Sequence, residues 1–117
     1  MSGTPHTTIS VGAPHVTLIN VFTVAPEHQA ELVEALDRST VETFVRIPGF
    51  RSANIHASLD GTRVVNYAQW ASKEHFEAML GRHDTQEHMK EIMTIAEKAE
   101  PHLYTVRAVH NIEFLGI

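Results

Sequence analysis

An Asp-Gly pair at residues 60 and 61 lies between two segments with strand character, and it constrains the fold more than any other feature. Residues 51–59 and 62–71 resemble strands in composition and length. An Asp-Gly pair between two such segments is a strong signal for a β-hairpin. The middle of the chain is therefore predicted to form two neighbouring antiparallel strands.

Before this hairpin, the sequence predicts one strand and one helix. Residues 15–24 are rich in β-branched side chains and predict a first strand. Pro26 suits the first turn of a helix, and apolar residues then recur at helical spacing up to Arg46. Pro48 ends this helix, because the residue before a proline is pushed out of the α region.

After the hairpin, the sequence predicts a helix in two pieces and a last strand. The first piece, 72–80, opens on a serine cap, and the second, 84–98, opens on an Asp-x-x-Glu capping box. Gly81 separates them, Pro101 stops the second, and residues 104–114 alternate enough to form a strand. The order predicts a ferredoxin-like α+β fold, βαββαβ, with a four-stranded antiparallel sheet.

Composition excludes several classes of protein. The 117 residues suit one domain, and the absence of cysteine excludes disulfides, thiolate metal sites and cysteine nucleophiles. A formal net charge of −5 gives nucleic-acid binding no support. No apolar run is long enough to cross a membrane. Residues 1–14 are predicted to be a mobile arm rather than a signal peptide, followed by one domain over 15–117 in a cytoplasmic protein.

A sheet covered by helices on one face leaves its other face to be explained. Apolar residues occur on both predicted faces of the hairpin strands, and an exposed apolar face of that size is typical of a partner site. Homodimerisation is the simplest way to cover it, and a homodimer is therefore predicted. The alternative is a mixed, solvated face.

The register of the hairpin decides which polar side chains meet. A three-residue loop over 59–61, with glycine in the left-handed position, would pair Asn54 with Asn66 and place them on one surface with His56 and Trp70. A two-residue loop would instead put His56 and Asn66 on opposite faces. The three-residue loop is the favoured prediction. It gathers a base, two amides and an indole into a possible small-molecule pocket.

The stretch from His56 to Trp70, with Val45 to Phe50 before it, resembles the antibiotic biosynthesis monooxygenase family. The likeness runs from the Pro-Gly-Phe turn through the second helix, and it is greatest to the anthrone-oxidising members of aromatic polyketide pathways. It implies a dimeric α+β barrel with a pocket between sheet and helices in each subunit. It also implies oxidation of a phenolic methylene to a quinone, with O₂ as co-substrate and without metal, flavin or haem.

The resemblance also suggests site residues. His56, Asn66 and Trp70 match positions implicated in the family's pocket and are the predicted catalytic residues. Phe76 stands where the actinorhodin-type relative has a tyrosine, and Lys90 where it has an arginine, so substrate preference is expected to differ. The predicted substrate-binding residues are Asn20, Asn54, Phe76, Met79 and Lys90.

The predicted chemistry fits these residue types. The protein must take a proton from an anthrone, stabilise the developing oxyanion and exclude water. Histidine has a suitable pKa for the base, an asparagine amide can donate to the oxyanion, and Trp70 offers a flat surface with one N–H donor. Which residue removes the proton stays open.

Three alternatives remain. A haem-degrading relative would share Asn20, but Met79 and Met89 stand where that group needs a tryptophan and a haem-ligating histidine. A non-catalytic binding or assembly module is favoured by the missing tyrosine. A metal protein is disfavoured because His83 and His88 are five residues apart, which does not place them on one helix face, and no metal ligands are predicted.

Overall fold

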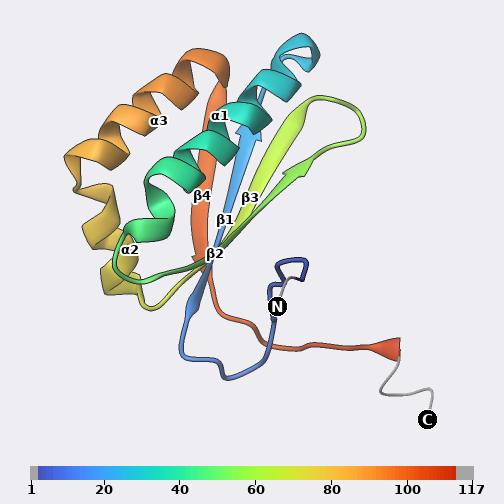
Figure 1. The fold of residues 1–117 in the computed structure, drawn as a ribbon. Coiled ribbons are helices and arrows are strands. Elements are labelled where there is room, and N and C mark those ends of the chain that lie inside the picture. The colour runs from blue at the N-terminus through green and yellow to red at the C-terminus, as the bar shows by residue number, and fades with distance from the viewer. Residues whose placement is uncertain (1–2, 113–117) are drawn as a thin grey trace.

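The computed structural model describes residues 3–112 and has the predicted element order (Figure 1). Four antiparallel strands form one sheet in the order β2-β3-β1-β4, and the helices lie on one of its faces. The ferredoxin-like α+β prediction is confirmed. The strands are β1 Val16–Thr23, β2 Phe50–Ala57, β3 Arg63–Trp70 and β4 Lys98–Tyr104. The helices are α1 Gln29–Glu42, α2 Lys73–Leu80 and α3 His83–Ile95, with short 3₁₀ turns η1 Pro26–His28 and η2 Phe44–Arg46.

The last strand differs from its prediction. Pro101 does not stop a helix but lies inside β4, opposite Asn20 of β1. Proline is confined in sheets largely to edge strands such as β4, whose outer side has no partner strand that needs an N–H. The predicted strand over 104–114 is therefore wrong: residues 105–111 are irregular and leave the body of the domain (Figure 1), and 113–114 lie outside the described residues.

The loop of the β2–β3 hairpin is one residue longer than predicted. Ser58 pairs with Arg63 rather than with Thr62, and its N–H donates to the Arg63 carbonyl at 3.0 Å. Asp60 explains the difference, because its Oδ1 accepts from the N–H of Thr62 at 3.0 Å and from its hydroxyl at 2.8 Å. These bonds hold Thr62 in the loop. Gly61 does adopt the predicted left-handed conformation, with φ of 82°.

The longer loop changes the register of the whole hairpin. Ile55 pairs with Asn66, and His56 pairs with Val65. The prediction that His56 and Asn66 share a surface is wrong, because a slip of one residue moves a side chain to the other face of a strand. The predicted pairing of Asn54 with Asn66 fails for the same reason. A bulge between Phe50 and Ser52 interrupts the ladder at the start of β2.

The face of the sheet away from the helices is partly apolar. Its central strands present Ile19, Val21, Val65 and Tyr67. The N-terminal segment over 3–14 contains no helix or strand but contacts this face. The Thr7 hydroxyl donates to Asn54 Oδ1 at 2.7 Å, and the Gln69 amide donates to the Thr8 carbonyl at 2.9 Å. The arm thus lies across one part of the outer face.

Two buried clusters fill the space between the sheet and the helices. One surrounds Phe22, Leu32 and Ile92, and the other surrounds Leu18, Trp70 and Met79. The first packs α1 and α3 on the sheet, whereas the second packs α2 on it. The pocket described below lies between them and takes walls from both clusters.

None of the helices within the described residues is long and apolar enough to span a membrane.

Candidate functional site

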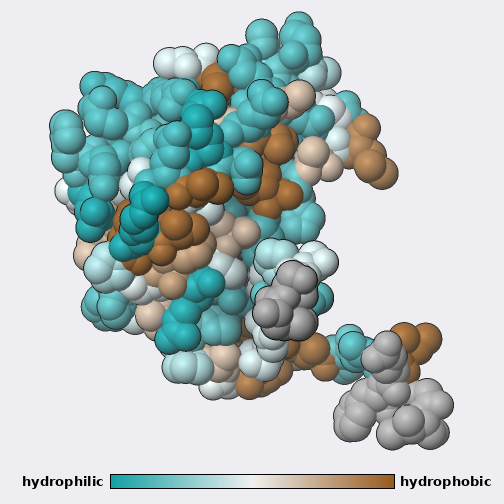
Figure 2. All heavy atoms as spheres, viewed as in Figure 1, coloured by the Kyte–Doolittle hydropathy of each residue, from teal (hydrophilic) through white to brown (hydrophobic). Residues whose placement is uncertain are grey.

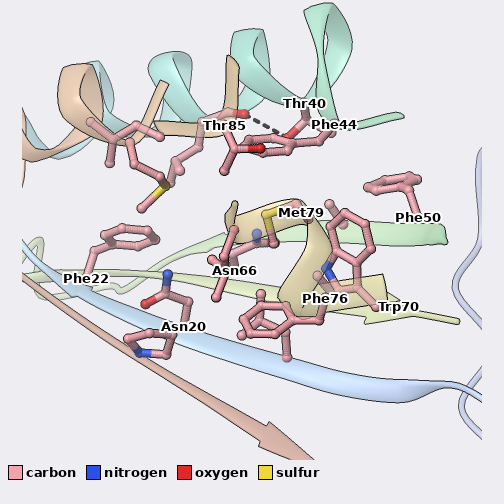
Figure 3. Close-up of a pocket in the computed structure, with 18 residues that line it drawn as sticks. Asn20, Phe22, Thr40, Phe44, Phe50, Asn66, Trp70, Phe76, Met79 and Thr85 are labelled. Atoms are coloured by element: carbon pink, nitrogen blue, oxygen red, sulfur yellow. Dashed lines mark hydrogen bonds between the residues drawn. The ribbon is translucent and has the colours of Figure 1, made fainter. Parts of the chain in front are cut away.

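A pocket of about 670 Å³, counting its open mouth, lies between the sheet and the helices (Figure 3). All four strands and all three α-helices contribute to its walls. Leu80 lines it and is 48 % exposed, so Leu80 lies at the mouth. Figure 2 shows a hydrophobic patch on the surface where the C-terminal half of α1 lies beside α2.

Two asparagines form the polar part of the floor. Asn20 of β1 and Asn66 of β3 lie directly opposite each other, and both side chains face the helices. Each has a buried Oδ1 with no hydrogen-bond partner in the described chain. Their outer neighbours in the same row are Ile55 and Pro101, which offer no polar side chain. A pair of amides is thus held ready for a group that enters the pocket.

Trp70 forms one end of the floor. Its side chain is 3 % exposed, and Phe50 packs edge-on against its indole at a centroid distance of 5.7 Å. Figure 3 shows the edge that carries the indole nitrogen turned toward Phe76 and Met79. The indole therefore presents a flat apolar surface and one donor at the pocket.

A tight turn before β2 positions α2, which carries Phe76 and Met79. Gly49 has φ of 92°, and a Cβ there would lie 2.4 Å from side-chain atoms of His75. Only glycine allows this approach without a shift. Ser72 caps the helix by accepting the N–H of His75 at 3.1 Å. These contacts hold the helix against the sheet, so Phe76 and Met79 face the pocket.

The helices contribute two threonines to the roof. The Thr40 hydroxyl of α1 donates to the Leu36 carbonyl at 2.8 Å, a bond within its own helix. The Thr85 hydroxyl of α3 is buried and has no partner among the described residues. Sequence reasoning missed both residues. Thr85 shares one helix face with Met89 and Ile92 at spacings of four and three, a pattern that could have identified it.

No acidic, basic or tyrosine side chain is among the residues that line this pocket. The carboxyls with displaced pKa values lie elsewhere. Hydrogen bonds, chiefly from the Thr62 N–H, lower the pKa of Asp60 to about 2 in the hairpin loop, and Arg82 lowers the pKa of Asp84 in the first turn of α3. Within the described residues no cluster of three or more His, Cys, Asp or Glu could hold a metal ion. The pocket therefore works with neutral donors.

Three of the predicted site residues lie away from this pocket. His56 and Asn54 are on the outer face of the sheet, because of the register change. His56 is exposed, and Asn54 donates to the Tyr67 carbonyl at 2.9 Å. Lys90 is 81 % exposed on α3, with its Nζ 4.0 Å from Glu87. The structure therefore does not bring these three side chains into the pocket, and the predicted shared surface of His56 with Asn66 is wrong. Asn20, Asn66, Trp70, Phe76 and Met79 do line the pocket, and their roles remain predictions.

A sequence profile described as antibiotic biosynthesis monooxygenase matches residues 15–94, which is most of the chain. The chain belongs to the antibiotic biosynthesis monooxygenase family. It is 51 % identical over 72 residues to the tetracenomycin F1 monooxygenase of Streptomyces glaucescens. These residues are 62 % of this chain and 64 % of that relative, so the chain matches less than two thirds of the relative's length.

Solved structures of the antibiotic biosynthesis monooxygenase fold agree with the match. The ActVA-Orf6 monooxygenase of Streptomyces coelicolor, determined in complex with nanaomycin D, has a TM-score of 0.73 and 30 % identity, over 85 % of this chain and 93 % of that one. SnoaB, a cofactor-independent oxygenase of Streptomyces nogalater, has a TM-score of 0.69 and 27 % identity, over 83 % of this chain and 97 % of that one. Each match covers nearly the whole of the relative's chain.

Proposed function

We propose that the protein is a cofactor-independent monooxygenase that oxidises a phenolic, anthrone-like polyketide intermediate to a quinone with O₂. The observation that carries this proposal is a largely apolar pocket whose polar groups are neutral amides, hydroxyls and an indole. The names of the relatives in Streptomyces, two monooxygenases and a cofactor-independent oxygenase, support the same activity.

The proposed reaction needs no external reductant. The substrate's CH₂ becomes C=O, one oxygen atom of O₂ enters the product, and the other leaves as water with the two hydrogens. The four electrons that reduce O₂ all come from the substrate. The protein therefore has to favour the substrate anion, which is the species that can transfer an electron to O₂.

The amides on the floor suit that task. Asn20 and Asn66 can each turn an N–H toward the enolate oxygen, and preorganised donors stabilise developing negative charge in a water-poor site. Trp70 supports the ring system. No side chain in the pocket lining can take the proton at neutral pH, so the proton passes to water at the mouth, or the substrate enters as its phenolate. Apolar walls then protect the peroxide formed by recombination with O₂ from water.

The test is oxygen uptake by metal-stripped protein with a panel of hydroxyanthrones and naphthols. The expected result is turnover with one O₂ consumed per quinone formed, and one ¹⁸O atom from labelled O₂ in the product. Heat-inactivated protein is the control, since anthrones oxidise slowly by themselves. Turnover that appears only after a metal ion, flavin or haemin is added would contradict the proposal.

A non-catalytic binding module is the alternative that the same pocket permits. It predicts binding of the aromatic ligand without turnover above the control. A haem-degrading activity does not fit the donor set. The pocket lining contains no histidine, and the ring of nearby His88 is engaged by the hydroxyls of Ser39 at 3.0 Å and Thr43 at 2.7 Å.

We also propose that the protein is a homodimer that buries the outer face of the sheet. The support is the apolar centre of that face, formed by Ile19, Val21, Val65 and Tyr67. Light scattering at micromolar concentration should give twice the chain mass of 13.1 kDa. A mass of one chain would contradict the dimer.

A further inference from the structure

The side chain of Thr85 is 1 % exposed, and its Oγ1 has no hydrogen-bond partner in the described chain. The N–H of the same residue is satisfied by Asp84 Oδ1 at 2.8 Å, so only the hydroxyl lacks a partner. The hydroxyl of Thr40, the other threonine of the roof, donates to the Leu36 carbonyl. A buried hydroxyl without a partner lowers the stability of the folded state, so its presence needs an explanation.

The position of Thr85 supplies that explanation. It is on the first turn of α3 and lines the pocket, on the same helix face as Met89 and Ile92. Figure 3 shows it under the helices, with Asn20 and Asn66 rising from the sheet on the other side of the cavity. The pocket thus has polar groups on two opposed walls, with apolar side chains between them.

We propose that the Thr85 hydroxyl binds a peripheral phenolic oxygen of the substrate, on the edge of the ring system opposite the one held by Asn20 and Asn66. This inference rests on the proposed function for the kind of ligand. A hydroxyl can donate to a phenolate or accept from a phenol, so Thr85 serves either ionisation state. The substrate is then a flat polycycle with oxygen on two opposite edges, and Thr85 determines specificity rather than the chemical step.

The first test needs no ligand. Thr85→Val keeps the shape of the side chain and removes the unpartnered hydroxyl. Its Tm should rise by about 2–5 °C. The matched control is Thr94→Val on the exposed side of the same helix, where the hydroxyl already donates to the Glu91 carbonyl at 2.6 Å. Its Tm should not rise. A Tm of Thr85→Val that falls would show that the hydroxyl stabilises the fold, and the inference would be wrong.

The second test measures binding. Trp70 is the only tryptophan and lies in the pocket, so quenching of its fluorescence reports ligand binding directly. Thr85→Val should bind 2,6-dihydroxyanthraquinone, whose two hydroxyls lie on opposite sides of the ring system and make no intramolecular hydrogen bond, about tenfold more weakly than the wild type, the loss of one hydrogen bond. It should bind unsubstituted anthraquinone equally well. Thr85→Ser, which keeps the hydroxyl, should restore most of the affinity for the dihydroxy compound.

The two compounds separate this inference from the proposed function. An equal loss for both, or no loss for either, would contradict the role of Thr85, whatever the turnover. Failure of the wild type to bind the dihydroxy compound would contradict it too. The predicted binding pattern together with no oxygen uptake would leave Thr85 as a ligand-specificity residue and would remove the monooxygenase proposal.

Discussion

Asn54 and Asn66 lie on neighbouring strands of one hairpin, but they face opposite sides of the sheet. On the outer face, Asn54 accepts from the Thr7 hydroxyl and donates to the Tyr67 carbonyl. On the inner face, Asn66 has a buried Oδ1 with no partner in the described chain, beside an equally unpartnered Asn20. The same residue type completes a structural contact on one face and leaves hydrogen-bonding capacity unused on the other.

This contrast shows where the chain gives up stability. Buried polar groups are normally satisfied, so several unpartnered ones around a single cavity indicate a site that awaits a ligand. Asn20, Asn66 and Thr85 all meet this description and all line one pocket. On the outer face Asn54 is satisfied, although the buried hydroxyl of Thr17 there also has no partner in the described chain. Asn54 is expected to contribute to stability rather than to turnover.

Asn66→Ala should have the largest effect on activity. It removes a donor to the developing oxyanion, and loss of one such donor costs about 10²–10³-fold in kcat. Because the Oδ1 of Asn66 has no partner in the free protein, its removal should cost little stability. Oxygen uptake and thermal unfolding of the same preparation measure the two effects. A variant that turns over normally would show that the amide pair does not stabilise the anion.

Trp70→Phe should have an intermediate effect. Phenylalanine keeps most of the apolar area but loses the N–H donor, so unfolding should become easier by roughly 1–2 kcal/mol. The KM should rise more than kcat falls, because the indole supports the ring rather than the reacting carbon. Steady-state kinetics beside urea unfolding gives both numbers. A variant that fails to fold, while a stabilised form of it turns over normally, would make Trp70 a core residue only.

Asn54→Ala tests the outer face. It removes the partner of Thr7 and the donor to the Tyr67 carbonyl, so stability should fall by about 1 kcal/mol. The value of kcat/KM should stay within about threefold of the wild type, since the effects of sites without shared partners are largely independent. Loss of activity greater than the loss of folded protein would contradict the division of the two faces.

The element order was predictable from the sequence because it depends on local signals. The Asp-Gly turn, the serine cap of α2 and the proline at the start of η1 each act over a few residues, and the structure has all of them. The prediction for Pro101 was wrong because a proline is compatible both with the end of a helix and with an edge strand. Only the pairing of β4 with β1 decides between them.

The site was predictable only in part, because it depends on register. His56 lies on the outer face rather than the predicted inner one because the hairpin loop is one residue longer than predicted. The Asp60 carboxylate holds that extra residue, Thr62, out of the ladder. Gln29 of α1 also donates to the carbonyls of Ser58 and Arg63, each at 2.9 Å. This tertiary contact joins residues far apart in the sequence, so no local pattern predicts it. Trp70 was easier to place, because its side chain faces inward whichever register the hairpin adopts.

Acid should weaken the loop that sets this register. The pKa of Asp60 is lowered to about 2 from 3.8, chiefly by the Thr62 N–H. A lowered folded-state pKa means that the stabilisation is complete above the unfolded pKa and is lost as the pH falls through about 2. The urea midpoint should therefore fall less in Asp60→Asn than in the wild type between about pH 5 and pH 2. Asp84, whose pKa is also lowered, titrates in both proteins and cancels in the comparison. Parallel curves would contradict this role of Asp60.

His56→Ala should have the smallest effect, although the sequence marks His56 as the natural base. A sole general base contributes about 10²–10⁴-fold, so its loss would be obvious. In the structure His56 is exposed on the outer face, and its Nδ1 is 3.2 Å from the Asn54 carbonyl rather than near the pocket. We therefore expect kcat/KM within about twofold of the wild type.

The pH–rate profile makes this test decisive. If the substrate supplies its own anion, the rising limb of kcat/KM should move with the phenolic pKa of each substrate in the panel and should be unchanged in His56→Ala. A limb that stays fixed across substrates and vanishes in the variant would identify His56 as the base. The side chain would then have to reach the substrate from the outer face of a sheet, which a single chain of this fold does not allow. Such a result would require the substrate to bind on the outer face, and it would overturn the assignment of the pocket itself.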